Sequence, residues 1–427
     1  MDAETQIVLE KQNPWWFNKH LDIGIARLNY YPDLKKYLKT QEIMLILGTR
    51  RSGKSTLLYQ LIDFLKTSPK QILFINLDEP LFQSKADNPT FLNKIIDDYI
   101  NQNKESNQFY IFIDEVQNYE YWIQTIKTFY DINKNIKFIL TGSTSALLKN
   151  TASTRLSGRY FTSTIFPLSF KEFLDFKNLN NLSLIQKQHA VNQYLQYGGF
   201  PRVVLEKDEI LKQDILKNYF QTIYLKDIIF TNKIRNNKEV FDLLYYVLSN
   251  IGVPFSYKNI AKILDISPDT VIEYLSYAEQ AYLIFQISKY DSSVKKQLLN
   301  HKKIYCIDTG LVNSVSFKFS ENRGRLLENL VFASLIANKK EVFYHKENNE
   351  CDFLIRDGRK IIQAIQVTTL LKEESVKKRE INGLLEALHK YNLKNGYIVT
   401  EVETDIIEIE GKKIFIIPIY DWLENKQ

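Results

Sequence analysis

The chain has 427 residues, of which 44% are hydrophobic and 13% aromatic, so it carries enough apolar material for two to four packed domains of about 150 residues each. Its 56 basic and 50 acidic side chains leave a net charge of +6, which permits contact with nucleic acid without requiring it. The two isolated cysteines, the absence of a signal pattern at the start and apolar runs far below the roughly 18 residues of a membrane helix exclude disulfide-rich secreted proteins and membrane proteins. We therefore expect a soluble cytoplasmic protein without a membrane partner.

Residues 1–40 form an N-terminal entry segment that is rich in aromatic side chains. Trp15, Trp16, Tyr30 and Tyr31 are expected to pack on the domain that follows, because aromatic rings bury large apolar areas. The alternative is that one of them stacks on a ligand bound by that domain.

Residues 43–65 combine an apolar run, a glycine loop and an amphipathic stretch. Residues 48–55 read GTRRSGKS and match G-x-x-x-x-G-K-[ST], the phosphate-binding loop of P-loop NTPases, at every fixed position. The flanking IMLIL and STLLYQLIDFL are typical of a buried parallel strand and a helix, so the loop opens a helix N-terminus that favours anions. Lys54 is expected to reach the β- and γ-phosphates and Ser55 to ligate Mg²⁺. The expected nucleotide-binding residues are Gly48, Arg51, Ser52, Gly53, Lys54, Ser55 and Thr56.

Two later apolar runs end in polar side chains that complete such a site. FYIFIDEVQ ends in Asp114, expected to hold the Mg²⁺ shell, and Glu115, expected to orient or deprotonate the attacking water. The alternative is an accidental acid pair at an exposed strand end. IKFILTGSTS ends in Thr141 and Ser143, either of which can sense the γ-phosphate or simply mark a strand-to-turn transition. The predicted chemistry is Mg²⁺-dependent ATP hydrolysis.

Short apolar runs alternate with helical patterns over residues 41–165. The runs cover residues 43–47, 71–76, 110–114, 137–141 and 160–166. This alternation predicts an α/β domain with a parallel sheet covered by helices and a ligand beyond the carboxyl ends of the strands. Residues 167–235 then read as helices interrupted by a YGGFP turn.

Residues 236–303 have the pattern of a winged helix-turn-helix module. FDLLYYVLSN predicts one helix, Ser256 caps a second, and Ser267 with Pro268 starts a third. In the DNA-binding reading the third helix enters a major groove, but its Asp269 and Glu273 would face phosphates.

The following KYDSSVKKQLLNHKK, residues 289–303, carries five lysines against one aspartate. It is either a basic wing that touches DNA phosphates or a solvated hairpin. A structural or protein-docking module is the alternative to DNA binding.

Motifs along nearly the whole chain resemble one family. In order, they are NPWWF, GTRRSGKSTLL, FIDEVQ, LTGSTS, LSGRY, FPLSFKEF, YGGFP, IDTGLVN, RGRLLENLVF and ECDFLI. The combination resembles bacterial and archaeal AAA-type P-loop ATPases with a C-terminal PD-(D/E)xK-nuclease-like domain of undefined role. The resemblance implies a small helical subdomain over the nucleotide and a C-terminal α/β domain like that of restriction endonucleases.

The resemblance also gives Arg159 of LSGRY a role as a nucleotide sensor or as a finger that reaches the γ-phosphate of a neighbouring subunit. Arg155 is a competing candidate. The alternative is a surface arginine paired with an acid.

In the nuclease-like domain the resemblance places a degenerate metal site at Glu328, Asp352 and Gln366. Gln366 stands where a second acid is needed and Thr368 where a lysine is needed, so DNA cleavage is not expected unless Lys360 or Lys372 substitutes. Glu328 can instead be a buried structural acid that pairs with Arg323 or Arg325.

These expectations divide the chain into an entry segment (1–40), an AAA-type ATPase domain with helical subdomain (41–235), a winged-helix module (236–303) and a degenerate nuclease-like domain (304–427). The leading hypothesis is an ATPase that uses ATP and Mg²⁺ and couples conformational change or homo-oligomer assembly to a C-terminal platform for DNA or protein. The alternatives are a nucleotide-gated DNA nuclease and a slow ATPase switch that docks a protein partner.

Overall fold

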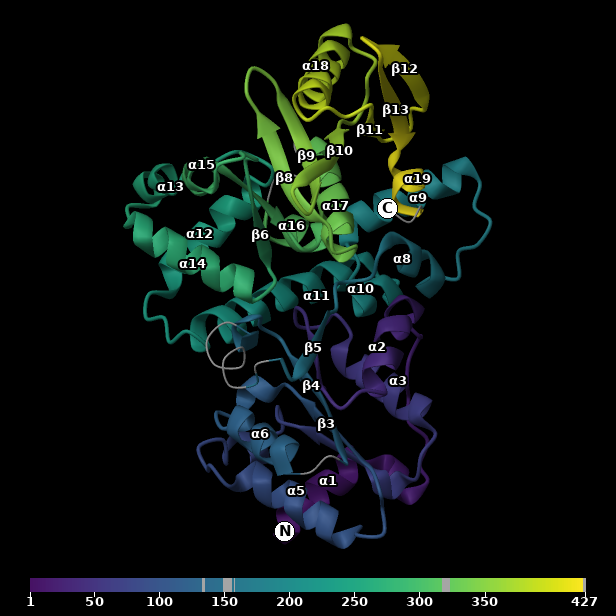
Figure 1. The fold of residues 1–427 in the computed structure, drawn as a ribbon, viewed down its shortest axis with the longest axis vertical. Coiled ribbons are helices and arrows are strands. Elements are labelled where there is room, and N and C mark those ends of the chain that lie inside the picture. Colours follow the sequence, from purple (N-terminus) through teal and green to yellow (C-terminus); the bar gives the residue numbers. More distant parts are fainter. Residues whose placement is uncertain (133–134, 149–155, 157, 317–322, 425–427) are drawn as a thin grey trace. The chain divides into compact units, whose positions relative to one another are not determined.

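The computed structural model describes residues 1–132, 135–148, 156, 158–316 and 323–424 (Figure 1). The chain divides into two compact units, Met1–Ile165 and Phe166–Gln427. The predicted division into four parts stays a prediction, although residue 303, its last boundary, lies inside strand β7 (Lys302–Cys306). Among the described residues, no helix is both long and apolar enough to cross a membrane.

The first unit is built on a parallel five-stranded sheet, as the alternating pattern predicts. The strand order is β2-β3-β4-β1-β5, and every neighbouring pair runs parallel. The strands are β1 (Ile43–Leu47), β2 (Ile72–Asn76), β3 (Phe109–Asp114), β4 (Ile136–Gly142) and β5 (Tyr160–Thr164). All five lie within two residues of their predicted bounds. Because β4 separates β1 from β3, side chains at its carboxyl end lie between the glycine loop and the acid pair.

Helices lie on both sides of this sheet, with α2 and α3 on one side and α5 and α6 on the other in Figure 1. They are α1 (Ala3–Gln12), α2 (Tyr31–Leu38), α3 (Lys54–Leu65), α4 (Pro80–Gln83), α5 (Phe91–Gln102) and α6 (Trp122–Ile132). Leu57, Leu58 and Leu61 of α3 pack on Met44 and Ile46 of β1 in one buried cluster. This contact holds the start of α3 at the carboxyl edge of the sheet.

The aromatic side chains of the entry segment pack against the first unit. The indole N–H groups of Trp15 and Trp16 both donate to the carbonyl oxygen of Ile72, at 3.4 and 2.9 Å. Trp16 also stacks on Tyr99, with 5.4 Å between ring centroids. These contacts agree with the packing reading of the two tryptophans.

The second unit opens with helices. They are α8 (Phe170–Phe176), α9 (Leu184–Tyr197), α10 (Pro201–Leu205), α11 (Glu209–Thr222), a π-helical segment (Ile223–Phe230), α12 (Asn237–Ser249), α13 (Tyr257–Leu264) and α14 (Pro268–Gln280). The predicted caps are present, since the Ser256 and Ser267 hydroxyls accept the N–H groups of Asn259 and Thr270. Strand β6 (Ile284–Ser288) follows and pairs antiparallel with β7.

The segment of residues 289–303, predicted to be either a basic wing or a solvated hairpin, connects β6 to its antiparallel partner β7 and includes the first two residues of β7. A short helix, α15 (Val294–Leu299), lies within it. Two of its five lysines are taken up by the fold: Lys302 Nζ donates to Ser288 Oγ at 3.1 Å, and the Lys303 side chain is buried among acids. The winged-helix assignment stays a prediction.

A mixed six-stranded sheet forms the C-terminal part, in the order β12-β13-β11-β10-β9-β8. Its elements, with the flanking helices, are α16 (Thr309–Val315), α17 (Arg323–Ala337), β8 (Glu341–Lys346), β9 (Glu350–Asp357), β10 (Lys360–Val367), α18 (Glu374–Lys390), β11 (Asn395–Thr400), β12 (Asp405–Ile409), β13 (Lys412–Pro418) and α19 (Ile419–Glu424). Leu384 and Leu388 of α18 are fully buried against Leu354 of β9 and Ile398 of β11. The restriction-endonuclease-like assignment stays a prediction.

The YGGFP turn and the IDTGL segment are in contact, and Asp308 of the second segment makes the hydrogen bond between them. The Gly199 N–H donates to Asp308 Oδ2 at 2.7 Å, and a Cβ on Gly198, whose φ is +72°, would lie 1.9 Å from Asp308 Oδ1. A Cβ on Gly310 would lie 2.3 Å from the carbonyl oxygen of Tyr197. Both motifs therefore need glycine, because Gly198 lies against the Asp308 side chain and Gly310 lies against the Tyr197 backbone, and neither contact leaves room for a Cβ.

This clasp predicts a pH-dependent stability. Burial raises the pKa of Asp308 to about 6 from 3.8, although backbone N–H groups favour its charged form. A folded pKa above the unfolded one means that the stabilisation is complete below about pH 4 and is lost as the pH rises through 6. The free energy of unfolding of the wild type should therefore fall, relative to that of Asp308→Asn, by up to about 3 kcal/mol between pH 4 and 7.

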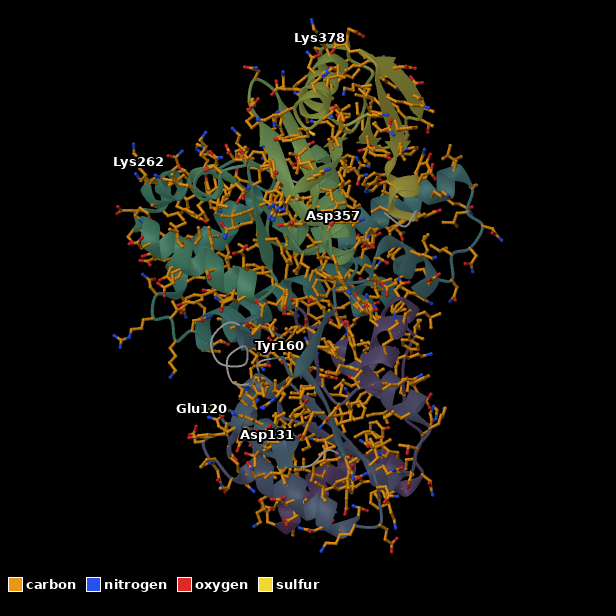
Figure 2. All side chains as sticks on the ribbon, in the orientation of Figure 1. Glu120, Asp131, Tyr160, Lys262, Asp357 and Lys378 are labelled. Atoms are coloured by element: carbon orange, nitrogen blue, oxygen red, sulfur yellow. The ribbon has the colours of Figure 1, made fainter. Side chains whose placement is uncertain are left out.

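Urea unfolding at a series of pH values measures that difference. The matched control is Asp357→Asn, which makes the same substitution at an exposed residue that is labelled in Figure 2. A wild-type curve parallel to that of Asp308→Asn would contradict the prediction.

Candidate nucleotide site

The loop between β1 and α3 is shaped by its glycines. Gly48 has a φ of +141°, and a Cβ on it would lie 2.1 Å from the carbonyl oxygen of Ile165, so no other residue fits. Gly53, with a φ of 97°, is the residue before α3. Arg51 between them is exposed and also left-handed, with a φ of 65°. The loop thus turns sharply and ends at the N-terminus of a helix, where backbone N–H groups favour anions.

Lys54 begins α3 and points back into this loop. Its side chain is 3% exposed, and Nζ donates to the carbonyl oxygens of Gly48 at 2.9 Å and Thr49 at 3.0 Å. Nζ also lies 3.7 Å from Glu115 Oε1. The ammonium therefore stands between the loop backbone and the acid pair.

Ser52 and Thr56 lie on either side of the lysine. Ser52 is fully buried, and its carbonyl oxygen accepts a hydrogen bond from Arg27 Nη1 at 2.9 Å. Thr56, in the first turn of α3, is half-buried next to Gly24 of the entry segment. The entry segment therefore supports the loop from behind through Arg27, a contact that the loop motif does not reveal.

Ser55, Asp114 and Thr141 form one hydrogen-bonded group across three elements. The Ser55 hydroxyl donates to Asp114 Oδ2 at 2.6 Å, and the Thr141 hydroxyl donates to Asp114 Oδ1. Burial, and then the charge of Glu115, raise the pKa of Asp114. The strand order brings these three side chains together, because β4 places Thr141 between the loop and the acid.

Glu115 is held as a carboxylate by cations. Burial alone would raise the pKa of Glu115, but the positive charges of Lys54 and Arg50 lower it by more, so the pKa lies below its usual value. Arg50 Nη2 lies 3.8 Å from Glu115 Oε2. The residue has a left-handed backbone, with a φ of 56°, at the end of β3. Glu115 is therefore an ionised carboxylate at this strand end, where it can accept a hydrogen bond from a water molecule.

Gln117 is a site residue that the sequence reasoning missed. Its Nε2 donates to Glu115 Oε2 and, at 3.0 Å, to Ser143 Oγ, so one amide joins the acid to the predicted sensor. Its Oε1 is buried, with no hydrogen-bond partner in the described part of the chain. The only signal in the sequence was the spacing of the glutamine two residues after the glutamate.

The donor set beside the loop suits Mg²⁺. Ser55 Oγ and Asp114 Oδ2 are hard oxygen ligands that lie next to each other, which is what this ion selects. A second group of side chains that could bind a metal ion lies in the second unit. Its members are His345, Glu347 and Glu386, whose ligand atoms lie within 4.8 Å of one another. There His345 Nε2 already pairs with Glu386 at 2.9 Å, so the group is satisfied without a metal.

Arg159 does not join the other predicted residues. Its backbone carbonyl accepts the Ile43 N–H at 2.8 Å, which places it at the amino end of β1. The glycine loop follows Leu47 at the other end of that strand, roughly 13 Å away by the rise of a strand. The guanidinium pairs with Asp131 of α6 at 3.0 Å and lies over Tyr130. Arg155 lies outside the described residues.

The predicted C-terminal residues do come together. Asp352 N donates to Gln366 Oε1 at 3.2 Å, and Glu328 lies close enough to Asp352 to raise the pKa of that acid, after burial. The contacts of Glu328 differ from the alternative reading, in which it pairs with Arg323 or Arg325. Arg323 pairs with Glu401, whereas Glu328 accepts from Lys303 Nζ at 3.0 Å.

The sequence reasoning missed two charged residues of this cluster, Lys303 and Glu380. Gln366 Nε2 donates to Glu380 Oε2, and Arg379 pairs with the same carboxylate. The distances in sequence, 25 residues from Lys303 to Glu328 and 14 from Gln366 to Glu380, leave no local pattern that could have revealed either contact.

Comparison with known families agrees with the nucleotide site. Residues 40–174 match the family model of an AAA domain. Residues 188–322 and 323–422 match two domains of unknown function, DUF8612 and DUF4143. The nuclease-like reading of the C-terminal part therefore stays a prediction.

Two relatives are similar over almost the whole chain. The uncharacterized protein MJ1544 of Methanocaldococcus jannaschii is 34% identical over 413 residues, which cover 91% of this chain and 90% of that protein. An uncharacterized protein of Haemophilus influenzae is 32% identical over 409 residues, which cover 93% of this chain and 98% of that protein. AMPPCP-bound DnaA from Aquifex aeolicus is a weak structural match, with a TM-score of 0.31, 17% identity and coverage of 59% of this chain and 87% of that chain.

Proposed function

This chain belongs to the same family as MJ1544, an AAA-domain family with C-terminal domains of unknown function, and we propose that it binds ATP with Mg²⁺ and hydrolyses it to drive a C-terminal protein-docking platform. One observation carries the catalytic part of the proposal. The Ser55 hydroxyl lies 2.6 Å from Asp114, with the ionised Glu115 one residue further, directly beside the glycine loop. This arrangement supports phosphoryl transfer to water better than simple nucleotide storage.

Each side chain has a role in this reaction. The loop N–H groups and Lys54 bind the β- and γ-phosphates, and Ser55 with Asp114 holds the Mg²⁺ ion, which neutralises charge on the phosphate oxygens. Glu115 orients the attacking water and accepts its proton. Gln117 acts on Glu115 rather than on substrate, because its amide fixes the carboxylate and ties it to Ser143. It is a positioning residue.

The surface of the second unit favours a protein as the partner of the platform. The side chains of Val294, Leu298 and Leu299 on α15 are exposed by 69, 68 and 76%, which is unusual for three large apolar residues on one short helix. The exposed Lys295 and Lys296 lie between them in sequence.

The charged side chains of α13 and α14 also favour a protein over DNA as the partner. The exposed acids of α14, Asp269 and Glu273, would repel a phosphate backbone. On α13, Lys262 projects into solvent in Figure 2, and the next residue in the sequence, Ile263, is also exposed. Apolar side chains interspersed with lysines fit an apolar partner surface with an acidic rim.

Glu115→Gln should keep ATP binding but lower turnover about 100-fold, because the amide keeps the shape of the side chain and cannot accept a proton. Lys54→Ala is the contrasting variant and should lose tight ATP binding. Nucleotide affinity and phosphate release measure the two effects separately. Unchanged turnover in Glu115→Gln would overturn the catalytic assignment, and strong stimulation of the wild type by duplex or single-stranded DNA would replace protein by DNA as the partner.

Gln117→Leu should lower kcat roughly 10-fold while KM for ATP changes little, because Glu115 keeps its charge but loses its fixed orientation. Asn118→Ala is the matched control, since Asn118 lies in the same turn and its Nδ2 donates to Asp78 instead. A loss of ATP affinity equal to the loss of kcat would mean that Gln117 supports the pocket as a whole and does not position the acid.

If Arg159 acts, it acts on a neighbouring subunit, because it lies at the edge of the sheet opposite its own loop. Mixed oligomers of Arg159→Ala and Lys54→Ala should then recover part of the wild-type turnover, since one subunit supplies the pocket and the other the arginine. Asp131→Asn tests the structural alternative by removing only the ion pair. No recovery in demonstrably mixed oligomers, with equal defects in Arg159→Ala and Asp131→Asn, would make Arg159 a structural residue.

A further inference from the structure

One buried ammonium lies at the centre of an acid cluster in the second unit. Lys303 Nζ is 2.8 Å from Glu350 Oε1, 3.0 Å from Glu328 Oε1 and 3.3 Å from Asp352 Oδ1. The lysine side chain is 1% exposed. The three carboxylates come from two elements, α17 and β9, whereas the lysine comes from β7. A single nitrogen thus joins three elements that are far apart in sequence.

Neighbouring groups also contact this cluster. The Tyr305 hydroxyl donates to Glu328 Oε1 at 2.5 Å, and the Val367 N–H donates to Asp352 Oδ2 at 2.9 Å. The ring of Tyr344 lies under the ammonium, 5.5 Å from its centroid. Burial lowers the pKa of Lys303, but Glu328 and the neighbouring acids raise it well above its ordinary value, so the lysine stays charged.

Three carboxylate oxygens that converge on one point are the ligand set that a divalent cation of the Mg²⁺ or Mn²⁺ class takes in proteins. Without a cation such a cluster is costly, because buried ionised carboxylates repel one another and lose their hydration. An ammonium group supplies a positive charge and three N–H donors, which matches three acceptors in number. Lys303 therefore offsets the negative charge of the three carboxylates, as a metal ion would.

We propose that the Lys303 ammonium is the resident cation of the Glu328, Glu350 and Asp352 cluster and takes the place of a divalent metal ion, so that the cluster binds no metal until Lys303 is removed. The cluster then serves as a fixed clasp of β7 onto α17 and β9. It also lacks the metal-bound water that phosphodiester cleavage at such acids requires. This inference does not depend on the ATPase proposal.

The test compares metal binding by Lys303→Met and by the wild type, both as full chains with Asp114→Asn added to remove the cation ligand of the nucleotide site. Mn²⁺ is titrated by calorimetry, and Tb³⁺ is followed by luminescence sensitised by Tyr305, which contacts Glu328. Lys303→Met should gain one Mn²⁺ site at least about 10-fold tighter than any in the wild type, and Mn²⁺ should raise its melting temperature. Lys302→Met, whose lysine pairs with Ser288, is the matched control and should gain no site.

Two results would overturn the proposal. One is an Mn²⁺ site in the wild-type chain that disappears in Asp352→Asn. The other is a folded Lys303→Met protein that binds Mn²⁺ no better than the wild type. If Lys303→Met folds only when Mn²⁺ is present during refolding, the proposal is supported, because the metal then replaces the missing charge. If it folds in neither buffer, the wild-type and Asp352→Asn titrations decide.

Discussion

Buried carboxylates need a cation, and this requirement shapes the chemically important part of each unit. In the first unit Asp114 and Glu115 follow one another at the end of β3, and Lys54 and Arg50 keep Glu115 ionised. In the second unit Glu328, Glu350 and Asp352 surround Lys303. In both places a buried aspartate on an apolar strand, Asp114 on β3 and Asp352 on β9, belongs to an acid cluster that a lysine from another element contacts.

The two lysines differ in what else they can bind. Lys54 Nζ donates to two neutral carbonyl oxygens of its own loop and lies 3.7 Å from Glu115, so phosphate oxygens can compete for its donors. Lys303 Nζ is within 3.3 Å of three carboxylates and has no exposed surface to offer a ligand. The first arrangement suits an exchangeable anion, whereas the second suits a permanent contact. The proposed ATP turnover therefore fits the first unit, because only there can a ligand displace the contacts of the lysine.

The parts of the fold that follow local rules could be predicted from the sequence. The five strands of the first sheet, the glycine loop and the caps at Ser256 and Ser267 each depend on residues within a few positions of one another. The contacts that were missed join distant residues: Lys303 with Glu328, Gln366 with Glu380, and Arg27 with Ser52. Helix α15 was missed because lysines dominate its segment, and its apolar residues face solvent instead of a core that would give a pattern. Arg159 was read from its motif, but only the strand order shows that it lies at the edge opposite the loop.

The motifs of the C-terminal half contact one another in pairs. YGGFP and IDTGL meet where Asp308 accepts the Gly199 N–H, and each leaves room for the other only because glycines stand at the contact. LLENLVF and ECDFLI supply the acids that Lys303, just before IDTGL, holds together. Residues 303–310 thus contact the helical part through Asp308 and the C-terminal sheet through Lys303. A short segment with two such buried polar contacts, one at each end, resists independent movement of the parts it joins, and the proposed platform requires this rigidity.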